Sequence, residues 1–298
     1  MRLIAIVLCL LLGKVIEVKA QDSIPPKKLI CPAGYTEKLD VTAFTVNGWE
    51  GKMDIYLPPK ELGLAPLVIN IHGGGWNKGT RQAAVGGLYG FLKKNYAIAN
   101  ISYRLTGTAT APAAIEDVRA ALFYLLRNLK ELNIDPDKVV LMGGSAGGHL
   151  ALMCGLLGNN HIFDDVAGNN RPKVKIAAII DKYGISDVWD WANGPNKTSI
   201  SARKWLGDKA DDREFANSVS PVSYVSKDSP PVFIVHGDAD PIVPISHSET
   251  LYQKLLAAGV KTEFQIVKGG LHGKFSPEDD KEIGRRIMQF LKSLKIHQ

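Results

Sequence analysis

Three short motifs carry residues whose types and spacing suit acyl transfer. The first is GGSAG at 143–147, which directly follows the apolar run KVVLM and precedes the apolar stretch HLALMCGLL. This is the strand-to-helix context of a nucleophile elbow, a strained turn that projects a serine hydroxyl and leaves no room for flanking side chains. The sequence therefore predicts Ser145 as a nucleophile. The alternative is a phosphate-binding or simply tight glycine turn.

The second motif, HGGGW at 72–76, follows the apolar run PLVINI. Glycines allow backbone N–H groups to approach an oxyanion without an intervening side chain. We predict oxyanion donors at Gly74 and Ala146, with Gly73 or Gly75 as neighbours.

The residues that flank these glycines, and the other histidines, need separate interpretations. His72 is predicted to orient the loop and not to transfer protons. Trp76 either binds substrate in the acyl pocket or packs beneath the loop. Structural roles are predicted for His149 and His236, and loop or surface positions for the remaining histidines outside the third motif: His161, His247 and His297.

The third motif is split between HGDADPIVP at 236–244 and GLHG at 270–273, each after an apolar run. A serine hydroxyl needs a neutral imidazole to take its proton and a carboxylate to fix the imidazole tautomer. We predict His272 and Asp240 in these roles, with Asp238 as the competing acid. No nearby His or Cys completes a ligand set with the two aspartates, so neither a metal site nor a cofactor is predicted.

The elements that must position these residues alternate between strand and helix. The segments KLDVTAFTV and KMDIYLPP read as an opening antiparallel pair. Continuous apolar runs then suit strands buried on both faces of a parallel sheet. They lie at 66–71, 96–101, 138–142, 175–180, 231–235 and 262–267.

Helices are predicted between and after these strands. Residues 112–131 show apolar positions at spacings of three and four, and a last helix begins at Ser276 with Pro277 in its first turn and Asp279 completing a capping box. The pattern predicts a doubly wound α/β sheet. Segment 187–219, with scattered tryptophans, is either a small lid or wall beside the site or a surface excursion anchored on the core.

Composition and charge narrow the possible partners. The chain has 298 residues, of which 45% are hydrophobic and 22% are charged, so wholesale disorder is excluded. Lys and Arg total 36 against 30 Asp and Glu, a net charge of +6 without a long basic run, so we expect no nucleic-acid partner.

The N-terminus predicts export. Arg2 precedes an apolar run at 3–13, and Val18-Lys19-Ala20 supplies small residues for cleavage before Gln21. We therefore expect a signal peptide at 1–20, a secreted or periplasmic location, a catalytic domain at 21–298 and no stable membrane insertion after cleavage. A membrane anchor and a lipoprotein are the weaker alternatives.

The three cysteines are too few for a disulfide scaffold. Cys9 lies in the predicted signal peptide. A bond between Cys31 and Cys154 stays open for an exported chain, although the apolar surroundings of Cys154 favour burial.

Taken with YRL at 103–105, PAAIED at 112–117 and DKYGISD at 181–187, the motifs resemble those of the α/β-hydrolase esterases and lipases that carry an HGGGW oxyanion motif. Within that class the chain is similar to secreted bacterial feruloyl and acetyl-xylan esterases related to the hormone-sensitive-lipase group. The resemblance implies an α/β-hydrolase fold with a mostly parallel sheet and at most a small lid. It also implies Ser145, Asp240 and His272 as the triad.

The implied reaction is hydrolysis of small esters or esterified oligosaccharides, with acetyl or hydroxycinnamoyl groups on plant polysaccharides as the expected substrates. An amide-cleaving enzyme (a peptidase or an arylformamidase) and a lipase-like esterase for short acyl chains are the alternatives. A binding module that has lost catalysis is disfavoured because all three triad residues are present. The oligomeric state stays open.

Overall fold

The computed structural model describes residues 29–83, 85–195 and 199–297. The predicted signal peptide at 1–20 lies outside these residues. The described chain forms an eight-stranded sheet in the order β1-β2-β4-β3-β5-β6-β7-β8. Its strands are β1 Thr36–Val46, β2 Trp49–Leu57, β3 Ala65–Ile71, β4 Ala97–Ile101, β5 Ile134–Gly144, β6 Ala178–Lys182, β7 Val232–Gly237 and β8 Thr262–Val267.

The sheet is antiparallel only at its N-terminal edge. β1 pairs with β2 and β2 with β4 in antiparallel register, whereas every pair from β4 to β8 is parallel. The predicted opening strand pair and parallel sheet are thereby confirmed. β6 begins three residues later than predicted, at Ala178, and extends to Lys182. β5 is longer than predicted because its pairing with β3 already starts at Ile134.

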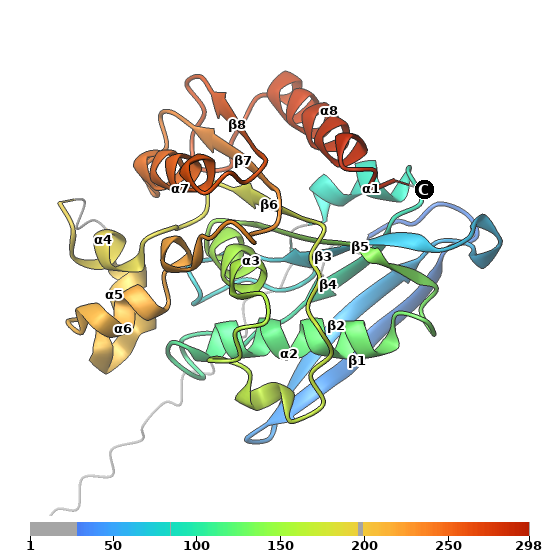
Figure 1. Cartoon of the computed structure of the whole chain (residues 1–298), viewed down its shortest axis with the longest axis horizontal. Coiled ribbons are helices and arrows are strands. Elements are labelled where there is room, and N and C mark those ends of the chain that lie inside the picture. Colours follow the sequence, from blue (N-terminus) through green and yellow to red (C-terminus); the bar gives the residue numbers. More distant parts are fainter. Residues whose placement is uncertain (1–28, 84, 196–198, 298) are drawn as a thin grey trace, which may run out of the picture.

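Helices cover both faces of the sheet (Figure 1). One apolar cluster packs α2 and α3 against the sheet, and a second packs α1 and α8 against the opposite face. The helices are α1 Tyr89–Leu92, α2 Ala113–Asn128, α3 Ala146–Leu157, α4 Val188–Asn193, α5 Ile200–Leu206, α6 Arg213–Ser218, α7 Ser246–Ala257 and α8 Pro277–Ser293.

The sheet separates the two cysteines of the described chain. Cys154 is completely buried in the α2–α3 cluster, whereas Cys31 packs against the α1–α8 cluster on the other face. They form no disulfide with each other.

Two helix predictions illustrate how local sequence sets the element ends. α2 occupies most of the predicted 112–131 segment. α8 begins as predicted, with the Ser276 hydroxyl accepting a hydrogen bond from the Asp279 N–H at 3.0 Å. The capping box differs in detail, because the Asp279 carboxylate accepts from the Ser276 hydroxyl.

The described parts of segment 187–219, residues 187–195 and 199–219, contain the short helices α4, α5 and α6, which gather at one end of the molecule in Figure 1. Its Trp205 is 0% exposed. The segment lies beside the carboxyl ends of the parallel strands, because Trp191 of α4 and Ser201 of α5 line the same cavity as residues at the ends of β3, β5 and β6. Ligand sites in open α/β sheets form at this edge.

Candidate active site

The turn between β5 and α3 holds Ser145 in a strained conformation. Its φ of 56° and ψ of −125° lie in a region that non-glycine residues rarely adopt. The turn is too tight for neighbouring side chains, since a Cβ on Gly143 would approach the Gly147 oxygen to 2.2 Å. A Cβ on Gly147 would come within 2.2 Å of the Ile71 oxygen. These contacts explain the glycines of the GGSAG motif.

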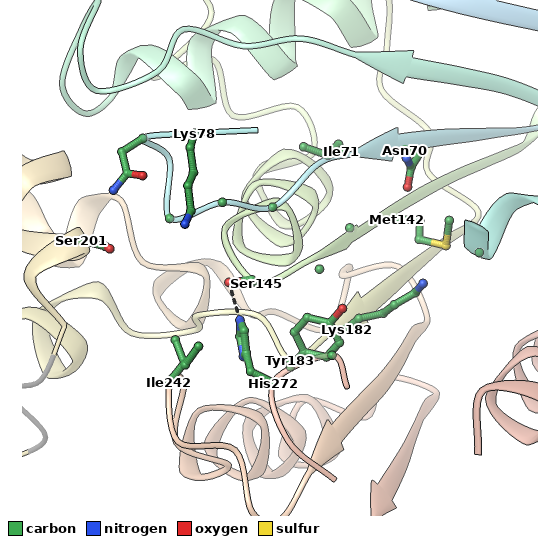
Figure 2. Close-up of a pocket in the computed structure, with 18 of the residues that line it drawn as sticks. Asn70, Ile71, Lys78, Met142, Ser145, Lys182, Tyr183, Ser201, Ile242 and His272 are labelled. Atoms are coloured by element: carbon green, nitrogen blue, oxygen red, sulfur yellow. Dashed lines mark hydrogen bonds between the residues drawn. The ribbon is translucent and has the colours of Figure 1, made fainter. Parts of the chain in front are cut away.

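Three side chains distant in sequence form a hydrogen-bonded chain at this turn. His272 Nε2 lies 2.9 Å from Ser145 Oγ, and His272 Nδ1 lies 2.6 Å from Asp240 Oδ2. Because a carboxylate only accepts, Nδ1 carries the proton and Nε2 is left to accept from the serine hydroxyl. Figure 2 shows the Ser145–His272 contact at the centre of the cavity. The structure thus brings together the three residues that the sequence singled out.

The turn after β7 holds the Asp240 carboxylate from several directions. Its Oδ1 accepts from the N–H groups of Ile242 and Val243 at 2.8 and 3.1 Å. Burial alone would raise the pKa of Asp240, but hydrogen bonds from His236 and His272 outweigh it and hold the pKa below the usual range. The carboxylate therefore stays ionised next to His272.

His236 is a second partner of this carboxylate. Its Nε2 lies 3.2 Å from Asp240 Oδ2 and 2.9 Å from the Val243 oxygen, and its Nδ1 lies 2.7 Å from Ser248 Oγ. Since both neighbours of Nε2 are acceptors, Nε2 carries the proton and the Ser248 hydroxyl donates to Nδ1. The sequence predicted only a structural role, and its one signal was the position of His236 in the motif that contains Asp240.

Asp238 does not join this arrangement. Its carboxylate is exposed and accepts from the backbone N–H of Gly269. The competing acid therefore stabilises the turn after β8, and Asp240 is the carboxylate that pairs with His272.

Tyr183 is a site residue that sequence reasoning missed. Its ring meets the His272 ring edge to face at a centroid distance of 4.9 Å, and burial raises the pKa of its phenol to about 12. A φ of 44° directs the chain sharply after β6, and a Cβ on Gly144 would lie 3.0 Å from the phenol oxygen. The signal was the DKYG sequence directly after an apolar strand.

The glycine loop after β3 approaches the elbow through its backbone. A Cβ on Gly73 would lie 2.7 Å from the Gly144 oxygen and 3.5 Å from the Ser145 Cβ. Gly74 has a φ of 120°, and a Cβ there would approach the Lys78 oxygen to 2.0 Å. Gly75, with a φ of 59°, faces Ser201 of α5. The loop cannot hold this position with side chains at 73 or 74.

Trp76 packs beneath the glycine loop, which is the second of the two predicted possibilities. The substrate-binding assignment is wrong, because the side chain is 0% exposed and does not line the cavity. Its ring stacks on Trp205 at 4.3 Å and meets the edges of His149 and Trp191. Burying a large indole beneath the loop fixes the loop to α3 and α5 and removes more apolar surface from water than exposure in a cleft would.

The remaining histidines divide into buried and exposed groups. His72 stacks on Tyr103 and its Nδ1 lies 2.8 Å from the Gly73 oxygen, in keeping with a loop-orienting role. His149 is buried against Val219, and burial lowers its pKa to about 4. The surface prediction for His247 is wrong, because this residue of α7 is 3% exposed and its Nδ1 faces the N–H of Asp187 at the start of α4. His161 and His297 are exposed as predicted.

A cavity of about 520 Å³ surrounds Ser145 and His272. Figure 2 shows two ends to it, with Lys78 and Ser201 on one side of Ser145 and with Asn70, Met142 and Lys182 on the other. Within the described ranges, no group of three His, Cys, Asp or Glu side chains is placed to hold a metal ion. Among the described helices, none is long and apolar enough to cross a bilayer.

Comparison with known proteins places this site in a family. The profile of the BD-FAE family matches residues 53–255. The chain belongs to the BD-FAE family. The match includes the glycine loop, the elbow and Asp240, and His272 lies beyond its end.

The curated relatives of this BD-FAE member include several named esterases. Esterase LipQ of Mycobacterium tuberculosis is 29% identical over 76% of this chain and 55% of its own length. The isoprenylcysteine alpha-carbonyl methylesterase ICME of Arabidopsis thaliana is 26% identical over 74% of this chain and 53% of its own length. The chain therefore spans about half the length of the curated relatives it matches.

Solved structures agree with the fold. A truncated form of a carbohydrate esterase from gut microbiota superposes with a TM-score of 0.74 at 28% identity, covering 88% of this chain and 99% of that one. Esterase 2 of Thermogutta terrifontis, in its apo form, gives 0.74 at 22% identity over 92% of this chain and 98% of that one, and so shows the fold alone. The expected α/β-hydrolase fold and the resemblance to its esterases are confirmed.

Proposed function

We propose that this BD-FAE member is a serine carboxylesterase that works through an acyl-enzyme on Ser145. The observation that carries the proposal is the hydrogen-bonded chain from Ser145 through His272 to Asp240 on a strained elbow. In this mechanism His272 Nε2 takes the hydroxyl proton as Oγ attacks the ester carbonyl. Asp240 stabilises the imidazolium that forms.

The same imidazolium then returns its proton to the departing alcohol, which leaves Ser145 acylated. Water deprotonated by His272 attacks the acyl-enzyme, and the carboxylic acid is released as Ser145 regains its proton. The hydrogen bonds that keep Asp240 ionised favour His272 in the tautomer that both steps need.

The negative charge of each tetrahedral intermediate requires backbone donors. We assign these to the N–H of Ala146, at the first position of α3, and to the glycine loop at Gly74, with Gly75 as its neighbour. Support comes from the close packing of Gly73 against the Ser145 Cβ, which sets the loop beside the elbow. The positive end of α3 adds to the stabilisation of an anion there.

The expected substrates are small esters, with acetyl or hydroxycinnamoyl esters of plant polysaccharides as the finer proposal. The solved neighbour at 28% identity is a carbohydrate esterase from gut microbiota, and this similarity supports the carbohydrate-ester class. Export through residues 1–20, with action outside the cytoplasm, is part of the same proposal.

The decisive experiment is hydrolysis of 4-nitrophenyl acetate by the wild type and by Ser145→Ala, with fluorophosphonate labelling as a second readout. Losing the nucleophile is expected to lower kcat by about 10⁴-fold or more and to abolish labelling. Ser201→Ala is the matched variant, because Ser201 lines the cavity but has no imidazole partner, and it should still be labelled. Retained activity in Ser145→Ala would overturn the proposal, as would a preference for amides in a panel of peptides, formamides and esters.

A further inference from the structure

The end of the cavity beyond Tyr183 is lined by side chains from three adjacent strands. Asn70 of β3 and Met142 of β5 are register partners, and Lys182 ends β6. Val68 and Ile180, two residues before Asn70 and Lys182 on their strands, belong to the α1–α8 cluster, as Met142 does. Because side chains alternate along a strand, all three face the α1–α8 side of the sheet. The cavity therefore extends from Ser145 over this face.

Lys182 is the charged residue at this end. Figure 2 shows its side chain reaching along the cavity toward Met142 and away from the Ser145–His272 pair. A Cβ on Gly87 would lie 3.2 Å from its Nζ, so the backbone at Gly87, which also lines the cavity, lies beside the ammonium. Across the described chain, the Lys182 ammonium has no carboxylate within ion-pair distance and no hydrogen-bond partner.

The charge balance of the cavity is positive. Of the described residues that line it, Lys78 and Lys182 are basic and none is Asp or Glu. The Asp240 carboxylate is occupied by His272 and His236. Burial lowers the pKa of Lys182. The negative charge of Asp280, at the exposed start of α8, acts in the opposite direction but offsets only part of this lowering.

We propose that Lys182 binds a carboxylate of the substrate, so that the preferred esters carry an anionic group on their acyl or alcohol part. A half-buried ammonium without a partner gains a charge-assisted hydrogen bond when a carboxylate arrives, and the low dielectric of the cavity strengthens it. Lys78 is exposed, so its charge is screened and it contributes less to selectivity. This inference rests on the proposed esterase function of the same cavity.

Matched ester pairs test the inference and separate the two parts of the substrate. For the acyl part, the mono-4-nitrophenyl esters of glutaric and adipic acid are compared with the corresponding methyl 4-nitrophenyl diesters, in which a methyl ester replaces the free carboxylate. For the alcohol part, 4-acetoxybenzoate is compared with its methyl ester. We expect kcat/KM to favour the carboxylate over its neutral partner by about 10- to 100-fold in at least one pair, the effect typical of a hydrogen bond to a charged group.

Variants then assign the preference to a residue. Lys182→Met should bring the ratio of the two kcat/KM values close to one, and Lys182→Arg should keep the preference. Lys254→Met, on the exposed surface of α7, removes the same charge far from the cavity and should leave the ratio unchanged. Binding of free glutarate to each folded variant by calorimetry gives a readout that does not depend on turnover.

The outcomes distinguish this inference from the proposed function. A wild type that hydrolyses neutral esters at least as well as every carboxylate partner overturns the inference and leaves the esterase intact. A preference abolished by Lys78→Met but kept by Lys182→Met also overturns it. A wild type that hydrolyses none of these esters contradicts the esterase itself.

Discussion

The two halves of the active site are held in place by different kinds of contact. The glycine loop and the elbow are fixed by backbone atoms packed so closely that a Cβ at Gly74 or Gly147 would lie 2.0 or 2.2 Å from a carbonyl oxygen. The turns after β7 and β8 are fixed by side-chain hydrogen bonds that converge on Asp240. The first half should therefore respond to added volume, and the second to changes of charge and hydrogen-bonding capacity.

The largest effect is expected in the hydrogen-bonded half, from Asp240→Asn. An amide at this position can donate to His272 Nδ1, which favours the wrong imidazole tautomer, so kcat should fall by about 10⁴-fold while the fold persists. Asp238→Asn is the control, since its carboxylate contacts only the Gly269 N–H among the described residues. Steady-state kinetics on 4-nitrophenyl acetate measure both. Equal losses in the two variants would contradict the assignment of the acid.

The backbone-held half is tested by Gly74→Ala. The new Cβ must displace the Lys78 carbonyl at a φ of 120° that alanine avoids, so the loop shifts and one oxyanion donor is lost. We expect kcat to fall by about 10²- to 10³-fold, with a lower melting temperature. Gly107→Ala, where a Cβ meets open space, should behave like the wild type. Normal kinetics in Gly74→Ala would place the oxyanion donors elsewhere.

His236 allows a finer test of the hydrogen-bonded half. His236→Leu removes the second imidazole from Asp240 and should lower kcat by about 10- to 100-fold, the worth of a hydrogen bond to a charged group. His236→Gln keeps a donor at the position of Nε2 and should recover part of this loss. If both variants lose the same activity together with the same stability, His236 serves packing alone.

The smallest effect is expected at Asp181, whose carboxyl is 0% exposed. Burial raises its pKa from 3.8 to about 7. The folded protein therefore binds this proton more tightly than the unfolded chain, and the contribution to stability is present below pH 4 and is lost as the pH rises through 7.

Asp181→Asn removes the buried charge, so its stabilising effect should be about 2 kcal/mol larger at pH 9 than at pH 5, where the carboxyl of the folded protein is still mostly protonated. Urea unfolding at the two pH values measures this difference. Asp208→Asn, at an exposed position, is the control. A gain of the same size at both pH values would show that the carboxyl keeps an ordinary pKa.

Residues at strand ends were predictable because short-range rules govern them. The apolar run before each motif, the glycines of the elbow and the serine cap of α8 depend on backbone sterics and local hydrogen bonds. The bounds of β5 and β6 were less predictable, because pairing with neighbouring strands decides where a strand begins.

The sequence by itself determined the parallel sheet, the strained serine and the candidate residues of the triad, since motif spacing and strand-to-helix alternation encode them. Only the tertiary structure decided that Trp76 lies beneath the loop, that His247 is buried and that His236 and Tyr183 surround the triad. The positive end of the cavity at Lys182 likewise forms only when β3, β5 and β6 lie side by side. These features depend on which distant segments come together at the sheet edge. Burial and charge pairing arise from contacts between residues far apart in the sequence, so no local stretch of chain determines them.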